Sequence, residues 1–269
     1  MTKTNLIRVA KSDKIKLKDI DAAAKGDYET KEETFARLDE LHGRISELQE
    51  RLFAENKQSL LIVLQAIDTG GKDGAVKSLL TGINPAGLHV TSFKAPNSLE
   101  LSHDFLWRIH ATAPARGMIG VWNRSHYEDV LITRVHNLID TQTCAARYEH
   151  INHFEKLLSD NGTTILKFFL HISKDEQKER LQARLDDPEK HWKFNPGDLK
   201  ERELWNDYQK AYEDAVNACS TDYAPWHIVP ADRKWARNIA IAEAVAQALE
   251  KMNPQFPTVE FDASKIVVK

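Results

Sequence analysis

The stretch LLIVLQAIDTGGKDGAVKSLL, residues 60–80, decides the fold. Its first seven residues are apolar apart from Gln65, which is typical of a strand buried on both faces. Residues 67–74 then contain three glycines and Lys72, and residues 75–80 have a helical pattern. A strand, a glycine-rich turn with a lysine and a helix, in this order, form the context that a phosphate-binding loop requires.

The loop has the chemistry of anion binding. Glycines allow backbone N–H groups to curl around an anion, and the N-terminus of the following helix adds partial positive charge. We expect Lys72 to bridge phosphate oxygens, with further phosphate contacts from Thr69, Gly70, Gly71, Asp73 and Gly74. Compared with the pattern G-x-x-x-x-G-K-[ST], Ala66 replaces the first glycine and Asp73 replaces the hydroxyl residue that would hold Mg²⁺.

Asp68 places a carboxylate inside this loop. A carboxylate beside phosphate is repelled unless a cation lies between them, so Asp68 is predicted to bind Mg²⁺ or to act as a base. The alternative is a purely structural glycine-rich turn that the Asp68 side chain caps. The strand before the loop and the helix after it favour the phosphate-binding interpretation.

A second polar cluster, Asn123-Arg-Ser-His-Tyr-Glu-Asp129, follows the apolar run of residues 118–122. Ligands of parallel α/β sheets bind at the carboxyl ends of the strands, so this cluster is predicted to face the phosphate loop. Arg124 is suited to clamp phosphate with two hydrogen bonds, and Glu128 and Asp129 are candidates for holding a metal or the acceptor nucleotide. The alternative is the first turn of a helix, where the helix dipole favours acidic residues.

A third cluster is rich in cations. Arg180 and Arg184 are four residues apart and so lie on one face of a predicted helix, and Lys190 and Lys193 follow before a proline–glycine break. We predict a mobile lid over about residues 180–205 that brings these charges over the transferring phosphates. The alternative is a solvated helix whose basic and acidic residues are interleaved.

Strands and helices alternate along the chain. Five apolar runs are predicted to be strands: residues 60–66, 88–93, 118–122, 163–172 and 226–230. Helical patterns cover residues 75–80, 99–112, 143–159, 174–218 and about 232–252. This alternation predicts an α/β domain of three layers, with a five-stranded parallel sheet and crossover helices.

The first 57 residues are predicted to be an arm and a long helix. Residues 1–20 are basic and irregular, and we expect a solvated arm; the alternative is a segment that docks on the body or on a partner. Thr30 and Glu33 form a capping box, and an apolar stripe from Phe35 to Leu52 follows at helical spacing. The body then covers residues 58–252, and residues 253–269 are expected to be a tail on the surface.

Composition excludes several classes of protein. The 269 residues are 42% hydrophobic and 29% charged, with 37 basic and 40 acidic residues and a net charge of −3, which argues against a dedicated nucleic-acid binder. Two cysteines far apart give no disulfide framework and fit a cytoplasmic location. No apolar stretch is long enough for a membrane helix, and the first residues show no secretory signal, so we expect no membrane association.

Together, the motifs resemble the polyphosphate kinase 2 family of polyphosphate:nucleotide phosphotransferases, specifically its single-domain subgroup. The resemblance rests on three motifs in family order, residues 68–74, 123–130 and 187–193, with supporting runs at 93–96, 103–107 and 226–234. It extends from about Asp19 to Met252. It implies a P-loop kinase fold like that of thymidylate kinase, Mg²⁺, and inorganic polyphosphate as phosphate donor or acceptor.

The matching positions also imply residue roles. Asp68 and Lys72 carry over as loop residues for metal and phosphate, and Arg184 carries over as a lid arginine. Asn123, Arg124 and Asp129 carry over as second-motif residues, with Asp68 and Asp129 as the predicted metal pair. Many family members have Asp at the position of Asn123, and the Asn form resembles the subgroup that uses both nucleoside mono- and diphosphates.

We therefore expect Mg²⁺-dependent, reversible phosphoryl transfer between polyphosphate and a purine nucleotide, AMP or ADP, by a homo-oligomer (dimer or tetramer). The cations expected to converge on the phosphate chain are Lys72, Lys77, Arg124, Arg180, Arg184, Lys190 and Lys193. One alternative is an ATP-dependent kinase of nucleotides or small molecules, which should have Ser or Thr after Lys72. Another is a non-catalytic nucleotide-binding module, which has no need of acids and lid arginines together.

Overall fold

The strand predicted from residues 60–66 is β2 (Ser59–Gln65), and it lies inside a six-stranded sheet in which each of its residues is buried. The computed structural model describes residues 4–261 and 265–268. The sheet order is β1-β6-β5-β2-β4-β3, and the other strands are β1 (Ile7–Arg8), β3 (Leu88–Ser92), β4 (Ile119–Asn123), β5 (Thr163–His171) and β6 (Trp226–Pro230). β2 to β6 are parallel, so the five predicted parallel strands are confirmed. The sheet differs from the prediction in its sixth strand, β1, which pairs antiparallel with β6.

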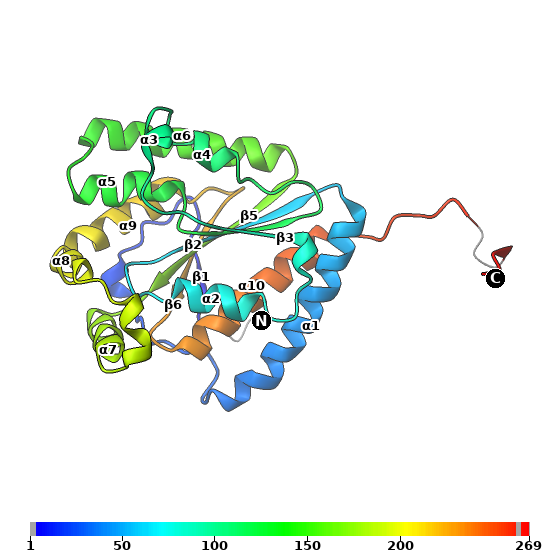
Figure 1. The fold of residues 1–269 in the computed structure, drawn as a ribbon, viewed down its shortest axis with the longest axis horizontal. Coiled ribbons are helices and arrows are strands. Elements are labelled where there is room, and N and C mark those ends of the chain that lie inside the picture. Colours follow the sequence, from blue (N-terminus) through cyan, green and yellow to red (C-terminus); the bar gives the residue numbers. More distant parts are fainter. Residues whose placement is uncertain (1–3, 262–264, 269) are drawn as a thin grey trace.

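Helices cover both faces of this sheet and make three layers (Figure 1). One layer contains α1 (Glu32–Glu55), α2 (Lys72–Leu79) and α10 (Lys234–Met252). The other contains α5 (Ile132–Val135), α6 (Thr141–Asp160) and α9 (Trp205–Cys219). The chain also contains short 3-10 helices: η1 (Leu17–Asp19), η2 (Pro85–Gly87), η3 (His126–Val130) and η4 (Pro188–Lys193). The α/β three-layer prediction is confirmed.

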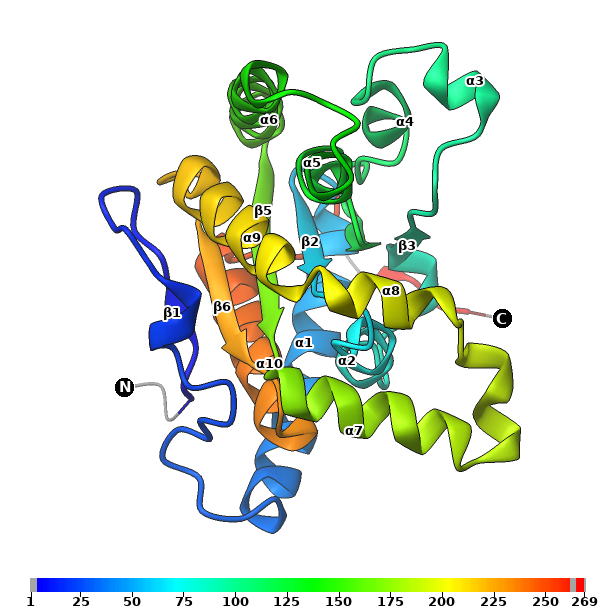
Figure 2. The same ribbon diagram turned by 90° about the vertical axis from the view of Figure 1, so that its left-hand side faces the viewer.

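Two further helices, α7 (Lys174–Leu185) and α8 (Gly197–Glu203), project from the body where the parallel strands end (Figure 2). The sequence pattern predicted one helical stretch over residues 174–218, and the structure divides it into α7, η4, α8 and α9. Pro188 and Pro196 lie at the start of η4 and α8, because proline is tolerated there but not inside a helix. No helix in the described ranges is both long and apolar enough to cross a membrane.

The N-terminal arm is not solvated as predicted. β1 pairs antiparallel with β6, and Val9 and Leu17 are each 1% exposed. The Ser220 hydroxyl donates to the Val9 carbonyl at 2.6 Å. Without β1, the backbone of β6 would be an unpaired sheet edge. The sequence pattern did not reveal this docking, because the few apolar residues that anchor the arm stand among many lysines.

Residues 99–112 are also not the single helix that their pattern predicted. They contain α3 (Ser98–Leu101) and α4 (Trp107–His110), separated by a turn in which the Asp104 carboxylate accepts from the Leu106 N–H at 2.9 Å. Asp side chains compete for backbone N–H groups in this way, and the turn interrupts the helix. Residues 1–3 of the predicted arm and 262–264 and 269 of the predicted tail lie outside the described residues.

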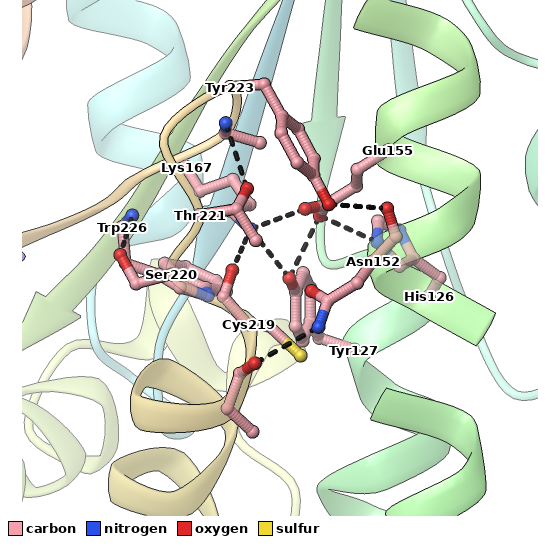
Figure 3. A network of polar contacts seen from close by, with 12 residues as sticks. His126, Tyr127, Asn152, Glu155, Lys167, Cys219, Ser220, Thr221, Tyr223 and Trp226 are labelled. Atoms are coloured by element: carbon pink, nitrogen blue, oxygen red, sulfur yellow. Dashed lines mark hydrogen bonds and ion pairs between the residues drawn. The ribbon is translucent and has the colours of Figure 1, made fainter. Parts of the chain in front are cut away.

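A fully buried ion pair lies between β5 and α6. Lys167 is 0% exposed, and its ammonium donates to Glu155 at 2.6 Å, to the Tyr127 hydroxyl at 2.8 Å and to the Cys219 carbonyl at 2.7 Å (Figure 3). Tyr127 donates in turn to Glu155 at 2.9 Å. Burial opposes the charge of Glu155, but Lys167 and His126 outweigh it and hold its pKa below the usual value. The ammonium therefore uses its three protons on three acceptors.

This network predicts a large loss of stability when one charge is removed. Glu155→Gln should lower the free energy of unfolding by about 3–5 kcal/mol, because it leaves the Lys167 charge buried without its counter-ion. Urea unfolding measures the loss. Lys156→Met, which removes an exposed ion pair with Asp160 on the same helix, is the matched control and should cost less than about 1 kcal/mol. Equal losses would show that the buried pair has no special role.

Candidate active site

The loop between β2 and α2 has a backbone that few residues tolerate. Thr69 and Gly71 have φ of +61° and +93°, in the left-handed region. At Gly70 an added Cβ would collide with the Ala66 side chain and would lie 2.8 Å from the Ile67 carbonyl oxygen. The glycines are therefore required by the tight turn, and the turn brings the first N–H groups of α2 to the end of β2. The first N–H groups of a helix have no partner within the helix, and in this position they are suited to bind an anion.

Side chains of Lys72 and of α7 hold carbonyl groups in and next to the turn. Three such hydrogen bonds are Lys72 Nζ to Ala66 at 2.8 Å, Gln177 Nε2 to Asp68 at 2.9 Å and Arg180 Nη1 to Thr69 at 3.1 Å. Gln177 and Arg180 belong to α7, so the base of the predicted lid is bonded directly to the loop. Satisfying the carbonyls on this side leaves the N–H groups for a ligand on the other.

Lys72 is the first residue of α2 and only 9% exposed. Burial and the neighbouring Arg124 lower its pKa to about 8, although the carboxylates of Asp68, Glu128 and Asp73 act in the opposite direction. The ammonium is therefore partly desolvated and surrounded by charge, and an anionic ligand would stabilise its protonated form.

Arg124 brings the second cluster to the loop. Its φ is +64°, and its N–H donates to the Leu64 carbonyl of β2 at 3.0 Å. Its guanidinium pairs with Asp68 at 2.7 Å and with Glu128 at 3.4 Å. Burial disfavours its charge, but these two carboxylates outweigh burial and raise the pKa of Arg124. The prediction that the second cluster faces the phosphate loop is thus confirmed for the position of Arg124.

Asn123, at the end of β4, also contacts the loop segment. Its amide Nδ2 donates to the Asp73 carboxylate at 2.7 Å. This bond orients Asp73, the residue that replaces the usual hydroxyl, toward the sheet end. Asn suits this position because its amide can donate, whereas an Asp here would place two carboxylates together.

These residues line a cavity of 560 Å³ at the carboxyl ends of the strands. Eight cationic side chains line it: Lys72, Lys94, Arg124, Arg180, Arg184, Lys190, Lys193 and Lys234. Three carboxylates line it as well, those of Asp68, Asp73 and Asp198. The site therefore carries an excess of five positive charges in a chain whose net charge is −3. Such a concave cationic site focuses its field on an anionic ligand.

Arg184 reaches the cavity from the last turn of α7. Its guanidinium donates to the Lys193 carbonyl at 3.1 Å and pairs with Asp198 of α8 at 3.4 Å. Burial and the nearby Asp68 raise the pKa of Asp198. Lys190 is more exposed and pairs with Asp187 at 2.6 Å. The ion pair between Arg184 and Asp198 thus connects α7 to α8 within the predicted lid.

Three predicted site residues do not line this cavity. Lys77 is exposed more than one turn further along α2. Glu128 reaches the site only through Arg124, and Asp129, on the 3-10 turn η3, faces Arg147 of α6 at 3.7 Å. Burial raises the pKa of Asp129 to about 6, partly offset by Arg147. The predicted metal pair of Asp68 and Asp129 is therefore not assembled in this cavity, because η3 turns Asp129 toward α6.

Three charged residues that line the cavity were not predicted from the sequence. Lys94 follows the end of β3 by two residues, Lys234 begins α10 after β6, and Asp198 lies in the first turn of α8. For Lys94 and Lys234 a signal was available, because both follow strands at the carboxyl edge of a parallel sheet. Asp198 had no such signal, since its place depends on how α8 folds back.

The donor set suits a hard divalent cation that is bound together with phosphate. No group of three or more His, Cys, Asp or Glu side chains is gathered as a metal site in the part of the chain that the structure describes. Mg²⁺, however, is commonly bound by one or two carboxylates, several waters and substrate phosphates. The Asp68 and Asp73 carboxylates both line the cavity beside the phosphate loop, so the residues present fit this mode of binding.

Known proteins share this architecture. The AMP/ADP-polyphosphate phosphotransferase of Meiothermus ruber is 51% identical over 85% of this chain and 86% of its own. The ADP-polyphosphate phosphotransferase of Rhodopseudomonas palustris is 42% identical over 95% of this chain and 92% of its own. The crystal structure of polyphosphate kinase 2 from Arthrobacter aurescens TC1 matches with a TM-score of 0.93 and 47% identity, over 96% of this chain and 92% of that one.

The sequence pattern of one family also covers most of the chain. It is described as Polyphosphate kinase 2 and matches residues 28–257, which include the phosphate loop, the second cluster and α7 to α10. The two relatives, each more than 40% identical over most of its length, support the same family. The geometry of the site agrees with this match. The chain therefore belongs to the polyphosphate kinase 2 family and is a kinase.

Proposed function

We propose that the protein transfers a phosphoryl group between inorganic polyphosphate and the purine nucleotides AMP or ADP, reversibly and with Mg²⁺. The observation that carries this proposal is the cavity itself, where a phosphate loop is surrounded by an excess of five positive charges. A single nucleotide needs fewer cations than this. A phosphate chain carries about one negative charge per phosphate unit and can therefore pair with all of these cations. The printed names of the two relatives, one for AMP/ADP and one for ADP, support the acceptors.

The chain's own residues would act by position and charge. Lys72 and Arg124 flank the loop and would hold the phosphate oxygens, while Arg184 would approach from α7. No covalent intermediate on the protein is needed, because phosphoryl transfer leaves little covalent chemistry to the enzyme. The acceptor of an AMP or ADP is itself an ionised phosphate oxygen, so no general base is required. Reversal follows from the same contacts, since donor and product are both phosphate chains.

Asp68 and Asp73 are the residues that we propose for Mg²⁺. When bound, the ion would screen phosphate charge and help align the two substrates. Asp68 already shares its charge with Arg124, and Asp73 is oriented by Asn123. These contacts hold both carboxylates in place beside the phosphate loop.

The direct test is an assay for ATP formed from polyphosphate. The protein is incubated with Mg²⁺, polyphosphate and either AMP or ADP, and both ADP and ATP are measured. Parallel reactions replace polyphosphate with ATP, supply AMP and are followed by the ADP that forms. ATP formation that depends on polyphosphate supports the proposal. Transfer only from ATP would instead identify an ATP-dependent nucleotide kinase, and tight nucleotide binding without transfer would identify a binding module.

The first prediction concerns Lys72. Lys72→Ala should lower the rate of transfer by about 10²-fold or more, because it removes a cation that stabilises the transferring phosphate. Lys77→Ala is the matched control, since Lys77 is an exposed lysine on the same helix and does not line the cavity. Initial rates and circular dichroism of both variants are compared. A folded Lys72→Ala protein with normal turnover would overturn the loop assignment.

The second prediction concerns Arg184. Arg184→Ala should lower kcat by about 10-fold to 10²-fold and leave the nucleotide KM nearly unchanged, because its contact is strongest with the transferring group. Lys200→Ala, an exposed cation of α8 outside the cavity, serves as control. A change confined to the nucleotide KM would make Arg184 a nucleotide anchor instead.

The third prediction concerns salt. The KM for polyphosphate should rise steeply with NaCl, because a polyanion bound along many cations releases condensed counterions. The nucleotide KM should change less, since a nucleotide touches fewer of these charges. Both are measured at several NaCl concentrations with fixed free Mg²⁺. Equal, shallow slopes would contradict an extended site for a phosphate chain.

A further inference from the structure

A second arginine lies behind the phosphate loop and does not line the cavity. Arg237 is on the first turn of α10 and only 2% exposed. Its guanidinium donates to the Gly71 carbonyl at 3.1 Å and, through two nitrogens, to the Asn238 side-chain oxygen at 3.0 and 2.7 Å. In the described ranges no carboxylate forms an ion pair with it. A buried guanidinium with only neutral acceptors is uncommon and costly.

The guanidinium is in close contact with the loop backbone. A Cβ added at Gly71 would collide with Arg237 Nη1, and a Cβ added at Gly74 would lie 3.3 Å from Nη2. Gly71 is thus glycine both because of its positive φ and because Arg237 fills the space beside it. The loop and the start of α2 therefore separate this charge from the cavity by a single layer of backbone.

Arg180 is an arginine at the same loop whose charge is paired with a carboxylate. It also donates to the loop, at the Thr69 carbonyl, but its charge is balanced by Glu176 at 2.6 Å. Arg237 has no such partner, and burial together with the positive charge of Arg180 lowers its pKa to about 10. Arg237 is still protonated at neutral pH. Its charge is left uncompensated in the protein alone.

We propose that Arg237 is a positioning residue whose fixed positive charge, behind the Gly71–Gly74 backbone, strengthens binding of the phosphate chain in front of it. The cost of burying the cation is offset when the loop holds an anion, because the anion supplies the missing counter-charge across one backbone layer. The hydrogen bond to Gly71 also keeps the loop carbonyl turned away from the ligand. This inference rests on the proposed function, since it takes polyphosphate as the anion.

The test compares stability with binding in Arg237→Met. Without ligand, the variant should be as stable as the wild type or more stable in urea unfolding, because an unpaired buried charge is replaced by an apolar chain of similar length. Its Kd for inorganic polyphosphate, measured by calorimetry, should rise by about 10-fold to 100-fold. Arg237→Lys keeps the charge and should recover part of the affinity, and Arg233→Met, an exposed cation just before α10, should leave Kd unchanged.

Two results would overturn the inference. One is a Kd for polyphosphate that is unchanged in a folded Arg237→Met protein. If Arg237→Met does not fold, Arg237→Lys and Arg237→Gln are compared instead. Equal Kd values of these two variants for polyphosphate are the second contradicting result, because they would show that Arg237 has a structural role alone. Failure of the proposed function is a separate observation, because it would appear in the wild type as no ATP formation from polyphosphate.

Discussion

The concentration of positive charge around one turn of backbone is the constraint on which the rest of the structure depends. Eight cations around a single cavity repel one another, so the fold must hold them before a ligand arrives. It does so with carboxylates that pair with Arg124 and Arg184, and with backbone carbonyls that accept from Lys72 and Arg180. The site is therefore organised in advance for an anion, at some cost to the stability of the empty protein.

The same hydrogen bonds join the loop to the lid. Gln177 donates to the Asp68 carbonyl and accepts from Arg202 of α8 at 2.9 Å. The side-chain amide of this α7 residue therefore connects the phosphate loop to α8. The base of α7 is thus part of the rigid site rather than a hinge. Arg184, at the far end of this helix, is held instead by the Lys193 carbonyl and by Asp198 of α8.

The buried network of Lys167 and Glu155 supports the other side of the site. Tyr127 is bonded to both of these residues and lies three residues after Arg124, whose backbone is in the left-handed region. A tightly held Tyr127 restricts the turn that aims Arg124 at Asp68. Stability in the sheet interior and geometry at the sheet edge are therefore linked through a few residues of η3.

The sequence by itself determined the five parallel strands, the phosphate loop and the family, because each depends on local patterns: apolar runs, a glycine turn next to a lysine, and motifs in order. Only the tertiary structure decided which charges meet. Lys94, Asp198 and Arg237 join the site from distant segments, whereas Asp129 turns away to α6. The docking of the arm on β6 was equally hidden, since an edge strand of two exposed residues leaves no periodic signal. Local spacing specifies elements, but contacts between elements depend on how their faces and turns pack in space.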